Sequence, residues 1–187
     1  MSSPTATHPA VLFHFSEDPT IARFEPRSLP PRNDPYSAPR PAEPLVWAID
    51  EAHAPLYFFP RDCPRAAFWA GPDTTPDDHA RFLGHTAAAR VIAIEGSWLD
   101  RVRYARLYVY RLPPAGFVPH DENAGNWVVR EAVTPLAVEP AGDLLARLVA
   151  AGVELRVTPS LWPLRHALVA SSLEFSMVRL RNARPEV

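Results

Sequence analysis

The sequence contains no lysine, and all 19 of its Lys-plus-Arg positions are arginines. A lysine Schiff base is therefore excluded as a catalytic device. Arginine stays charged at neutral pH, and its planar fork suits phosphate and carboxylate groups. Because 21 acidic residues bring the formal net charge to −2, we do not expect general nucleic-acid binding, which needs a concentrated basic surface.

Cysteine and glycine are also scarce. The single cysteine, Cys63, excludes an intramolecular disulfide and a cysteine-rich zinc site. Only 7 glycines are present, and no glycine-rich phosphate loop, GxGxxG, GxSxG or HExxH motif occurs. The sequence therefore offers no support for a P-loop, a Rossmann dinucleotide fold, an α/β-hydrolase or a zinc protease.

Long apolar runs are absent. No stretch approaches the roughly 18 uninterrupted apolar residues that a membrane span needs, and the first ten residues lack the regions of a signal peptide. We therefore expect a cytoplasmic protein without a membrane partner, flexible over residues 1–9. A chain of 187 residues, 47% apolar and 21% charged, fits one domain over 1–187; the oligomeric state stays open.

Proline, by contrast, is abundant at 23 residues, and it is densest in residues 25–44. Proline fixes one backbone dihedral and lacks the N–H donor, so this segment cannot form a helix or a central strand. We predict a long connection here. A lid or binding loop and an exposed crossing without a role are both open interpretations.

Short apolar or alternating segments indicate strands. In "VLFHF" (11–15) the alternation places Phe13 and Phe15 on one face and Leu12 and His14 on the other. The further segments that predict strands are 45–49, 65–70, 90–95, 106–112, 126–133, 153–157 and 173–181.

Helix signals are fewer. Asp50 is a candidate N-cap for a short helix interrupted at Pro55, and Ser97 for a helix near 96–103. Thr158 followed by Pro159 predicts another helix start. The remaining helices are expected near 76–83 and over 143–152, the latter ending at Gly152. Strands dominate, so we predict an α+β fold of mixed, mostly antiparallel split sheets with short flanking helices.

Two polar clusters are candidates for a metal site, "DDHARFLGH" (77–85) and "HDEN" (120–123). His79 and His85 are six residues apart and would point in different directions on one helix. Either cluster needs further ligands supplied by folding. Solvated loops are the preferred interpretation, and we expect no metal.

Cys63 lies in "PRDCPR" (60–65), between Arg61 and Arg65. Neighbouring guanidinium groups lower a thiol pKa where they are close in space, but a lone cysteine is more commonly a small buried hydrophobe. The two arginines are the stronger signal, because they are placed to bracket an anionic ligand.

The order of three segments carries a resemblance to a known fold. "HFS" (14–16) is followed by "LVWAIDEAHAPLYF" (45–58) and later by "GNWVVREAV" (125–133). This order resembles the ADP-ribosyltransferase-like fold, in which a His-x-Ser/Thr strand precedes an aromatic strand, a helix ending in Ala-x-x-Tyr and a late strand with an acidic residue. The resemblance implies an NAD-type nucleotide as the small-molecule ligand.

Individual positions match that pattern. His14 and Ser16 correspond to the ribose-contacting pair, Trp47 to the tyrosine that stacks on nicotinamide, and Tyr57 to a second, helix-borne tyrosine. Arg61 or Arg65 would then meet phosphate.

The acidic position departs from the family pattern. Aligning the late strand puts Asn126 where the catalytic glutamate normally stands, and an amide supplies no counter-charge to a developing cation. Glu131 is acidic but five residues further on, on the opposite strand face from Asn126. The resemblance thus implies His14 with Asn126 or Glu131 as the catalytic set, and Glu17 is the other carboxylate that would stand in for the missing glutamate.

The whole chain also resembles an uncharacterised bacterial family, on "HFSE", "WAIDEAHAPLYFFPRDCPR", "LYVYRLP" and "FSMVRLRNA". Two alternatives to a nucleotide enzyme stay open. One is a non-catalytic ligand-binding or protein-interaction module, in which Trp47 and His14 are packed away from solvent. The other is a hydrolase or nuclease that uses His14, His53 and an acidic partner.

Overall fold

The computed structural model describes residues 9–29 and 41–186. It divides into two compact units, unit 1 with residues 1–54 and 108–139, and unit 2 with residues 55–107 and 140–187. The expectation of one domain over 1–187 stays a prediction. The predicted flexible start, except for Pro9, and residues 30–40 of the proline-rich connection lie outside the described residues.

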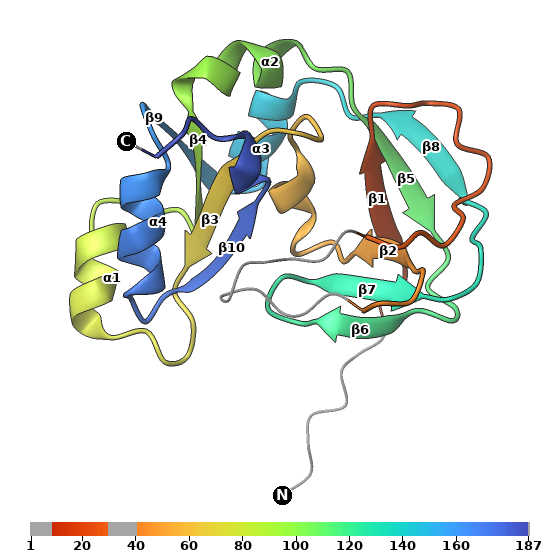
Figure 1. Ribbon diagram of the computed structural model, residues 1–187, viewed down its shortest axis with the longest axis horizontal. Helices are drawn as coiled ribbons and strands as arrows, with labels where there is room; N and C mark the ends of the chain where they lie inside the picture. Colours follow the sequence, from red (N-terminus) through yellow and green to blue (C-terminus); the bar gives the residue numbers. More distant parts are fainter. Residues whose placement is uncertain (1–8, 30–40, 187) are drawn as a thin grey trace, which may run out of the picture. The chain divides into compact units, whose positions relative to one another are not determined.

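In the described part of the chain, unit 1 is built on a six-stranded sheet with the order β6-β7-β2-β1-β5-β8 (Figure 1). The pairs β1–β2, β1–β5, β2–β7 and β6–β7 are antiparallel. The bounds are β1 Leu12–Ser16, β2 Val46–Ile49, β5 Tyr108–Leu112, β6 Val118–Asp121, β7 Asn126–Val129 and β8 Ala137–Pro140.

The two faces of β1 differ as the alternation predicts. His14 is paired with Tyr110 and Leu12 with Leu112 on β5, so these residues share one face of the sheet. This face carries the core of unit 1, where Leu12 is fully buried. Phe13 points to the other face.

The segment after β1 covers that core. Phe24 forms an isolated antiparallel bridge with Val133 and packs its ring at 5.1 Å from the ring of Tyr110. The Tyr110 hydroxyl donates to the carbonyl of Asp18 at 2.6 Å and accepts from the N–H of Ile21 at 3.1 Å. A fully buried phenol thus satisfies its polar atom and ties this segment to β5.

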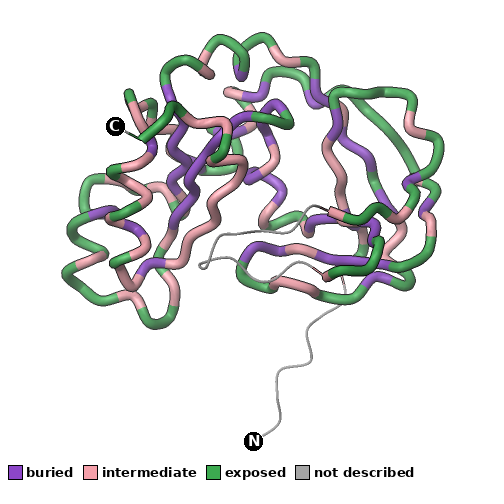
Figure 2. Tube along the Cα trace, viewed as in Figure 1, coloured by how far each residue is buried: buried purple, intermediate pink, exposed green. Residues whose placement is uncertain are grey.

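Among the described residues, unit 2 has a four-stranded sheet with the order β10-β3-β4-β9. The pair β4–β9 is parallel, and the pairs β3–β4 and β3–β10 are antiparallel. The bounds are β3 Arg65–Trp69, β4 Arg90–Glu95, β9 Val153–Thr158 and β10 Glu174–Val178. Figure 2 shows buried positions running along β3 and β4, the two central strands.

Short helices flank this sheet. α1 (Pro76–Leu83) and α4 (Trp162–Val169) pack on the face that presents Phe68 (Figure 1). α2 (Leu99–Tyr104) and α3 (Leu144–Ala150) contact each other, and α3 contacts β9. The 3-10 turns are η1 Ala54–Tyr57, η2 Gly96–Trp98 and η3 Leu180–Asn182.

The helices predicted near 76–83 and over 143–152 are confirmed, and each begins at a residue whose side chain caps the first turn. Thr75 accepts from the N–H of Asp78 and begins α1, and Asp143 accepts from two N–H groups and begins α3. The expected stop after α3 is present at Gly152, whose φ of 67° is in the left-handed region.

Three helix predictions are wrong in detail. Thr158 begins no helix, because it is the last residue of β9, paired with Glu95, and α4 starts only at Trp162. Ser97 caps nothing; it lies inside η2, which leads into α2. The segment after Asp50 forms a turn and the 3-10 turn η1 instead of an α-helix. Strands β6 and β8 have no counterpart in the prediction, because each has only four residues, one of them a proline, and so gives no clear strand pattern.

The fold is therefore α+β, with two mostly antiparallel sheets and few, short helices, which confirms the predicted class at this level. Within the described residues, no helix combines the length and the apolar character that a bilayer crossing demands.

Glu95 at the end of β4 is a buried carboxylate, 1% exposed. It accepts from the N–H of Leu161 at 3.3 Å and from the N–H of Arg184 at 3.0 and 3.2 Å. We expect Glu95→Gln to lower the free energy of unfolding by about 2–4 kcal/mol, because a donor replaces one acceptor in a closed site. Urea denaturation measures the change.

The matched control is Glu186→Gln, which alters an exposed carboxylate 3.1 Å from His166. This change should stay within about 0.5 kcal/mol. Equal stabilities of the two variants would contradict the bracing role of Glu95.

Candidate functional site

His14 is half-buried on β1. Its Nδ1 lies 3.0 Å from the carbonyl oxygen of Trp47, and its ring centroid lies 4.7 Å from that of Phe24. A carbonyl oxygen only accepts, so Nδ1 carries the proton in this contact. In the neutral imidazole, Nε2 then holds the lone pair.

Ser16 lies two residues further along the same face of β1. It is 9% exposed, and its Oγ accepts from the N–H of Asp18 at 3.1 Å. The hydroxyl proton remains to be donated, because this contact uses only a lone pair. His14 and Ser16 are thus brought together on one face, as predicted from their spacing.

Trp47 and Asn126 lie on the other face of the same sheet. Phe13 and Asn126 are each paired with Ile49 of β2, and Trp47 is two residues from Ile49. The Trp47 ring stands edge to face against His120, with centroids 4.8 Å apart. Trp47 therefore reaches His14 through its backbone carbonyl, while its indole lies on the opposite side of the sheet.

Glu131 does not lie in a strand. β7 ends at Val129, and Glu131 is exposed in the bend that follows. The expectation that it lies on the opposite strand face from Asn126 is wrong, because the backbone leaves the ladder before reaching it.

Tyr57, Arg61 and Arg65 belong to unit 2. Arg65 is 3% exposed on β3; its Nε donates to the carbonyl of Leu56 at 2.7 Å, and its Nη1 to that of Cys63 at 2.9 Å. The guanidinium carbon lies 5.5 Å from the ring centroid of Tyr57. Arg65 and Tyr57 are thus brought together, and Arg61 is exposed in the adjoining turn.

Cys63 is fully buried. Burial raises the pKa of its thiol to about 12, although the nearby Arg65 guanidinium acts in the opposite direction. Burial and the raised pKa both oppose a reactive thiolate, and the expectation that Cys63 is a small buried side chain is confirmed.

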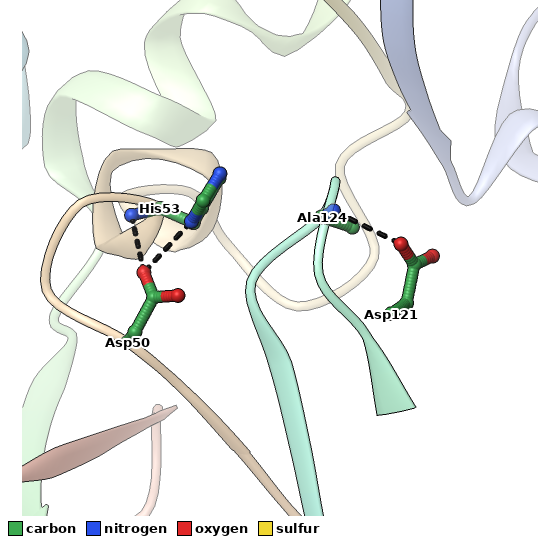
Figure 3. Close-up of polar contacts among 4 residues, drawn as sticks. All are labelled: Asp50, His53, Asp121 and Ala124. Atoms are coloured by element: carbon green, nitrogen blue, oxygen red, sulfur yellow. Dashed lines mark hydrogen bonds and ion pairs between the residues drawn. The ribbon is translucent and has the colours of Figure 1, made fainter. Parts of the chain in front are cut away.

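The turn after β2 contains a carboxylate–imidazole pair, Asp50 and His53 (Figure 3). The sequence predicts Asp50 as a helix cap and His53 as part of the hydrolase alternative, but not their pairing. Oδ1 of Asp50 accepts from the backbone N–H of His53 at 2.9 Å and from its Nδ1 at 2.7 Å. The two side chains are 24% and 17% exposed. The carboxylate holds the proton on Nδ1, so Nε2, which points away from Asp50, is the basic nitrogen.

Desolvation acts to raise the pKa of Asp50, but hydrogen bonds and charge from His53, with a hydrogen bond from the Trp127 side chain, lower it overall. Such a pair fits general acid–base chemistry. The acidic partner of His53 in the open hydrolase hypothesis is therefore Asp50. The signal in the sequence is the Asp-x-x-His spacing across a turn.

The neighbouring turn makes room for this pair. Asp121 accepts from the N–H of Ala124 at 3.0 Å (Figure 3), and Gly125 follows with a φ of 67°. The carbonyl of Gly125 accepts from the N–H of Asp50 at 3.1 Å. A Cβ at Gly125 would overlap the His53 ring.

The two predicted polar clusters have structural roles at their key positions. Asp121 closes the turn just described, and Asp78 accepts from the hydroxyl and the N–H of Ser172 at 2.6 and 2.7 Å. His79 and His85 are exposed. Within residues 9–29 and 41–186, no group of three or more His, Cys, Asp or Glu side chains is placed to hold a metal ion.

Comparison with known proteins gives one result. The model of a family of unknown function (DUF6886) matches residues 13–183, in agreement with the end-to-end resemblance to an uncharacterised family. No curated protein and no solved structure matches the chain.

Gly125→Ala should lower the free energy of unfolding by about 2–4 kcal/mol, because it adds a Cβ both at positive φ and against the His53 ring. Gly142→Ala is the matched control: its φ is 71°, and nothing lies within 4 Å of the added Cβ. We expect about 1 kcal/mol for the control, with both variants measured in urea. A loss no larger for Gly125→Ala than for Gly142→Ala would argue against close packing on His53.

Asp50→Asn should flatten the acid dependence of stability. A carboxyl whose pKa is lower in the folded than in the unfolded chain stabilises the protein above its unfolded value, about 3.9, and this stabilisation is lost as the pH falls through the folded value. Between about pH 4 and pH 2 the wild type should lose more stability than the variant. Denaturation midpoints across this window provide the measurement.

Asp100→Asn is the control for the acid series, because Asp100 is 78% exposed and its charge is screened by solvent. Parallel profiles for the wild type and Asp50→Asn would show that the carboxylate does not stabilise the turn.

Proposed function

Because the chain belongs to the DUF6886 family of unknown function, its activity must be inferred from its own residues, and we propose that it binds an NAD-type nucleotide through the ribose. His14 and Ser16 are the binding pair. The observation that carries the proposal is the contact of His14 Nδ1 with the Trp47 carbonyl at 3.0 Å, from which we infer that Nδ1 carries the proton. Without such a contact, the imidazole would present either nitrogen to a ligand.

The chemistry of the pair matches a ribose diol. A ribose hydroxyl both donates and accepts, so its recognition needs one acceptor and one donor close together. His14 Nε2 supplies the acceptor, and the Ser16 hydroxyl supplies the donor, on the same face of β1. The resemblance to the ADP-ribosyltransferase-like fold assigns the same two positions to ribose.

The finer parts of the proposal concern the rest of the ligand. The resemblance assigns stacking of a flat ring to Trp47 or Tyr57 and contact with phosphate to Arg61 or Arg65. Tyr57, Arg61 and Arg65 belong to unit 2, so the proposal for unit 1 rests on His14 and Ser16. The Trp47 indole lies on the opposite sheet face from His14, so it does not stack on a ring held against His14 and Ser16. NAD is the proposed substrate, and the proposal requires no metal.

Catalysis would be cleavage of the nicotinamide–ribose bond. The C–N bond breaks through an oxocarbenium-like state, nicotinamide leaves with the electron pair, and an acceptor nucleophile bonds to the anomeric carbon. This state needs a carboxylate, which only Glu131 supplies among the three proposed catalytic residues, His14, Asn126 and Glu131. The exposed position of Glu131 and the amide at Asn126 favour the alternative, a ligand-binding module that does not cleave its ligand.

Millimolar NAD should raise the melting temperature of the wild type, because a ligand that binds only the folded state stabilises it. His14→Ala should abolish this rise, each protein being compared with its own ligand-free value by differential scanning fluorimetry. His85→Ala replaces an exposed histidine of unit 2 and should keep the wild-type response.

If about 10 mM NAD leaves the melting temperature of the wild-type protein unchanged, the nucleotide proposal is wrong, because any remaining binding would be weaker than millimolar. Free nicotinamide in the same samples, detected by chromatography, would identify the enzymatic form. A shift without nicotinamide release would identify the binding module.

A further inference from the structure

Unit 2 gathers arginines from two distant parts of the chain. Arg61 and Arg65 come from the loop and strand around Cys63, and Arg179 and Arg181 follow β10. We call these four residues the arginine cluster. The side chain of Arg179 donates from Nε to the carbonyl of Arg61 at 3.2 Å, so residues 118 positions apart meet.

Arg65 is the buried member. Two of its five N–H donors are used by the carbonyls of Leu56 and Cys63, and its guanidinium carbon lies 5.1 Å from the Phe59 ring centroid. No carboxylate of the described residues forms an ion pair with it. A buried cation without a counter-charge is costly, so its retention needs a reason beyond the two carbonyl contacts.

Arg179 is held in an unusual backbone conformation. It is the one non-glycine of the described residues at positive φ, 58°, a conformation that costs roughly 1–3 kcal/mol and is found preferentially at functional sites. Burial lowers the pKa of its guanidinium, followed by the charges of Arg181 and Arg61. Burial also lowers the pKa of the Arg65 guanidinium, and the charge of Arg179 lowers it further. The cluster members therefore lie within each other's fields.

Too few acidic groups neutralise this charge. Asp62 lies 3.9 Å from Nε of Arg179, and its side chain is 65% exposed, so its charge is well solvated and weakly coupled. Its backbone carbonyl accepts from Nδ2 of Asn182 at 2.8 Å, which ties the Arg61 loop to η3. Within the described residues, Asp62 is the one carboxylate that forms an ion pair with any of these four guanidinium groups, which leaves an excess of positive charge among them.

A purely structural role accounts for part of this arrangement. Arg65 braces the segment from Leu56 to Cys63 through its two carbonyl contacts. That role does not explain the strained placement of Arg179 beside Arg65. A neutral donor would brace the loop without the repulsion among like charges.

We propose that the arginine cluster binds the diphosphate group of a phosphorylated small molecule. Guanidinium forks bind phosphate oxygens in pairs, and four of them offer more donors than one phosphoryl group can accept. A diphosphate also supplies the negative charge that the cluster lacks. This inference concerns unit 2 alone, and it requires neither His14 nor a ribose.

The test is isothermal titration of the full chain with inorganic pyrophosphate at low ionic strength. Wild-type protein should bind it, and more tightly than inorganic phosphate. Arg179→Asn removes the guanidinium but keeps a residue that tolerates positive φ, and it should weaken binding at least about tenfold. Arg61→Gln should act in the same direction without touching the buried strand.

Arg103→Gln is the matched control. It removes the same charge from an arginine of α2 that is 49% exposed and paired only with Asp100, so the pyrophosphate affinity should stay within about twofold. Melting curves verify that each variant is folded. Equal weakening by Arg103→Gln and Arg179→Asn would overturn the site, since it would indicate general attraction by net charge.

Further outcomes separate this inference from the nucleotide proposal. Pyrophosphate binding that depends on Arg179, with no response to NAD, supports the cluster and removes the ribose site. No pyrophosphate binding at about 10 mM by folded wild type overturns the cluster, even if NAD still shifts the melting temperature through His14. If inorganic phosphate binds as tightly as pyrophosphate, the proposal of a diphosphate ligand is wrong.

Discussion

The buried charged side chains of unit 2 form hydrogen bonds with backbone groups, and these hydrogen bonds hold the loops of the unit in place. Glu95 accepts three N–H contacts from Leu161 and Arg184, and Arg65 donates to the carbonyls of Leu56 and Cys63. A buried ion has to recover its lost hydration from fixed partners. The segments that carry those partners are therefore held against the ends of β4 and β3, and with them the arginine cluster.

Unit 1 follows the same principle with a phenol and an imidazole. The Tyr110 hydroxyl and the His14 imidazole each donate to a backbone carbonyl, of Asp18 and of Trp47. Such contacts select one tautomer or rotamer of the side chain. The register of β1 then decides what shares its surface: Ser16 lies beside His14, whereas the Trp47 indole is turned to the opposite face. The residues that the sequence predicts to contact a ligand are thus divided between the two faces of this sheet.

Local chemistry made much of the fold predictable. The strands at β1, β3 and β4 follow their apolar patterns, and α1 and α3 begin at capping side chains that contact the first turn. The failures have local causes too. β6 has only four residues and contains a proline. Thr158 pairs with Glu95 of β4 as the last residue of β9, so it is not at the start of a helix. Tertiary pairing outweighs a capping preference of about 1 kcal/mol.

By itself the sequence determined the α+β class, the spacing that puts His14 and Ser16 on one strand face, and the presence of arginine as the only long-chain cation. Only the tertiary structure decided that Cys63 is sealed from solvent, that Asp50 pairs with His53, and that Arg179 meets Arg61. The reason is physical: periodicity and capping act over a few residues, whereas burial and contact between distant segments depend on how the sheets and loops pack.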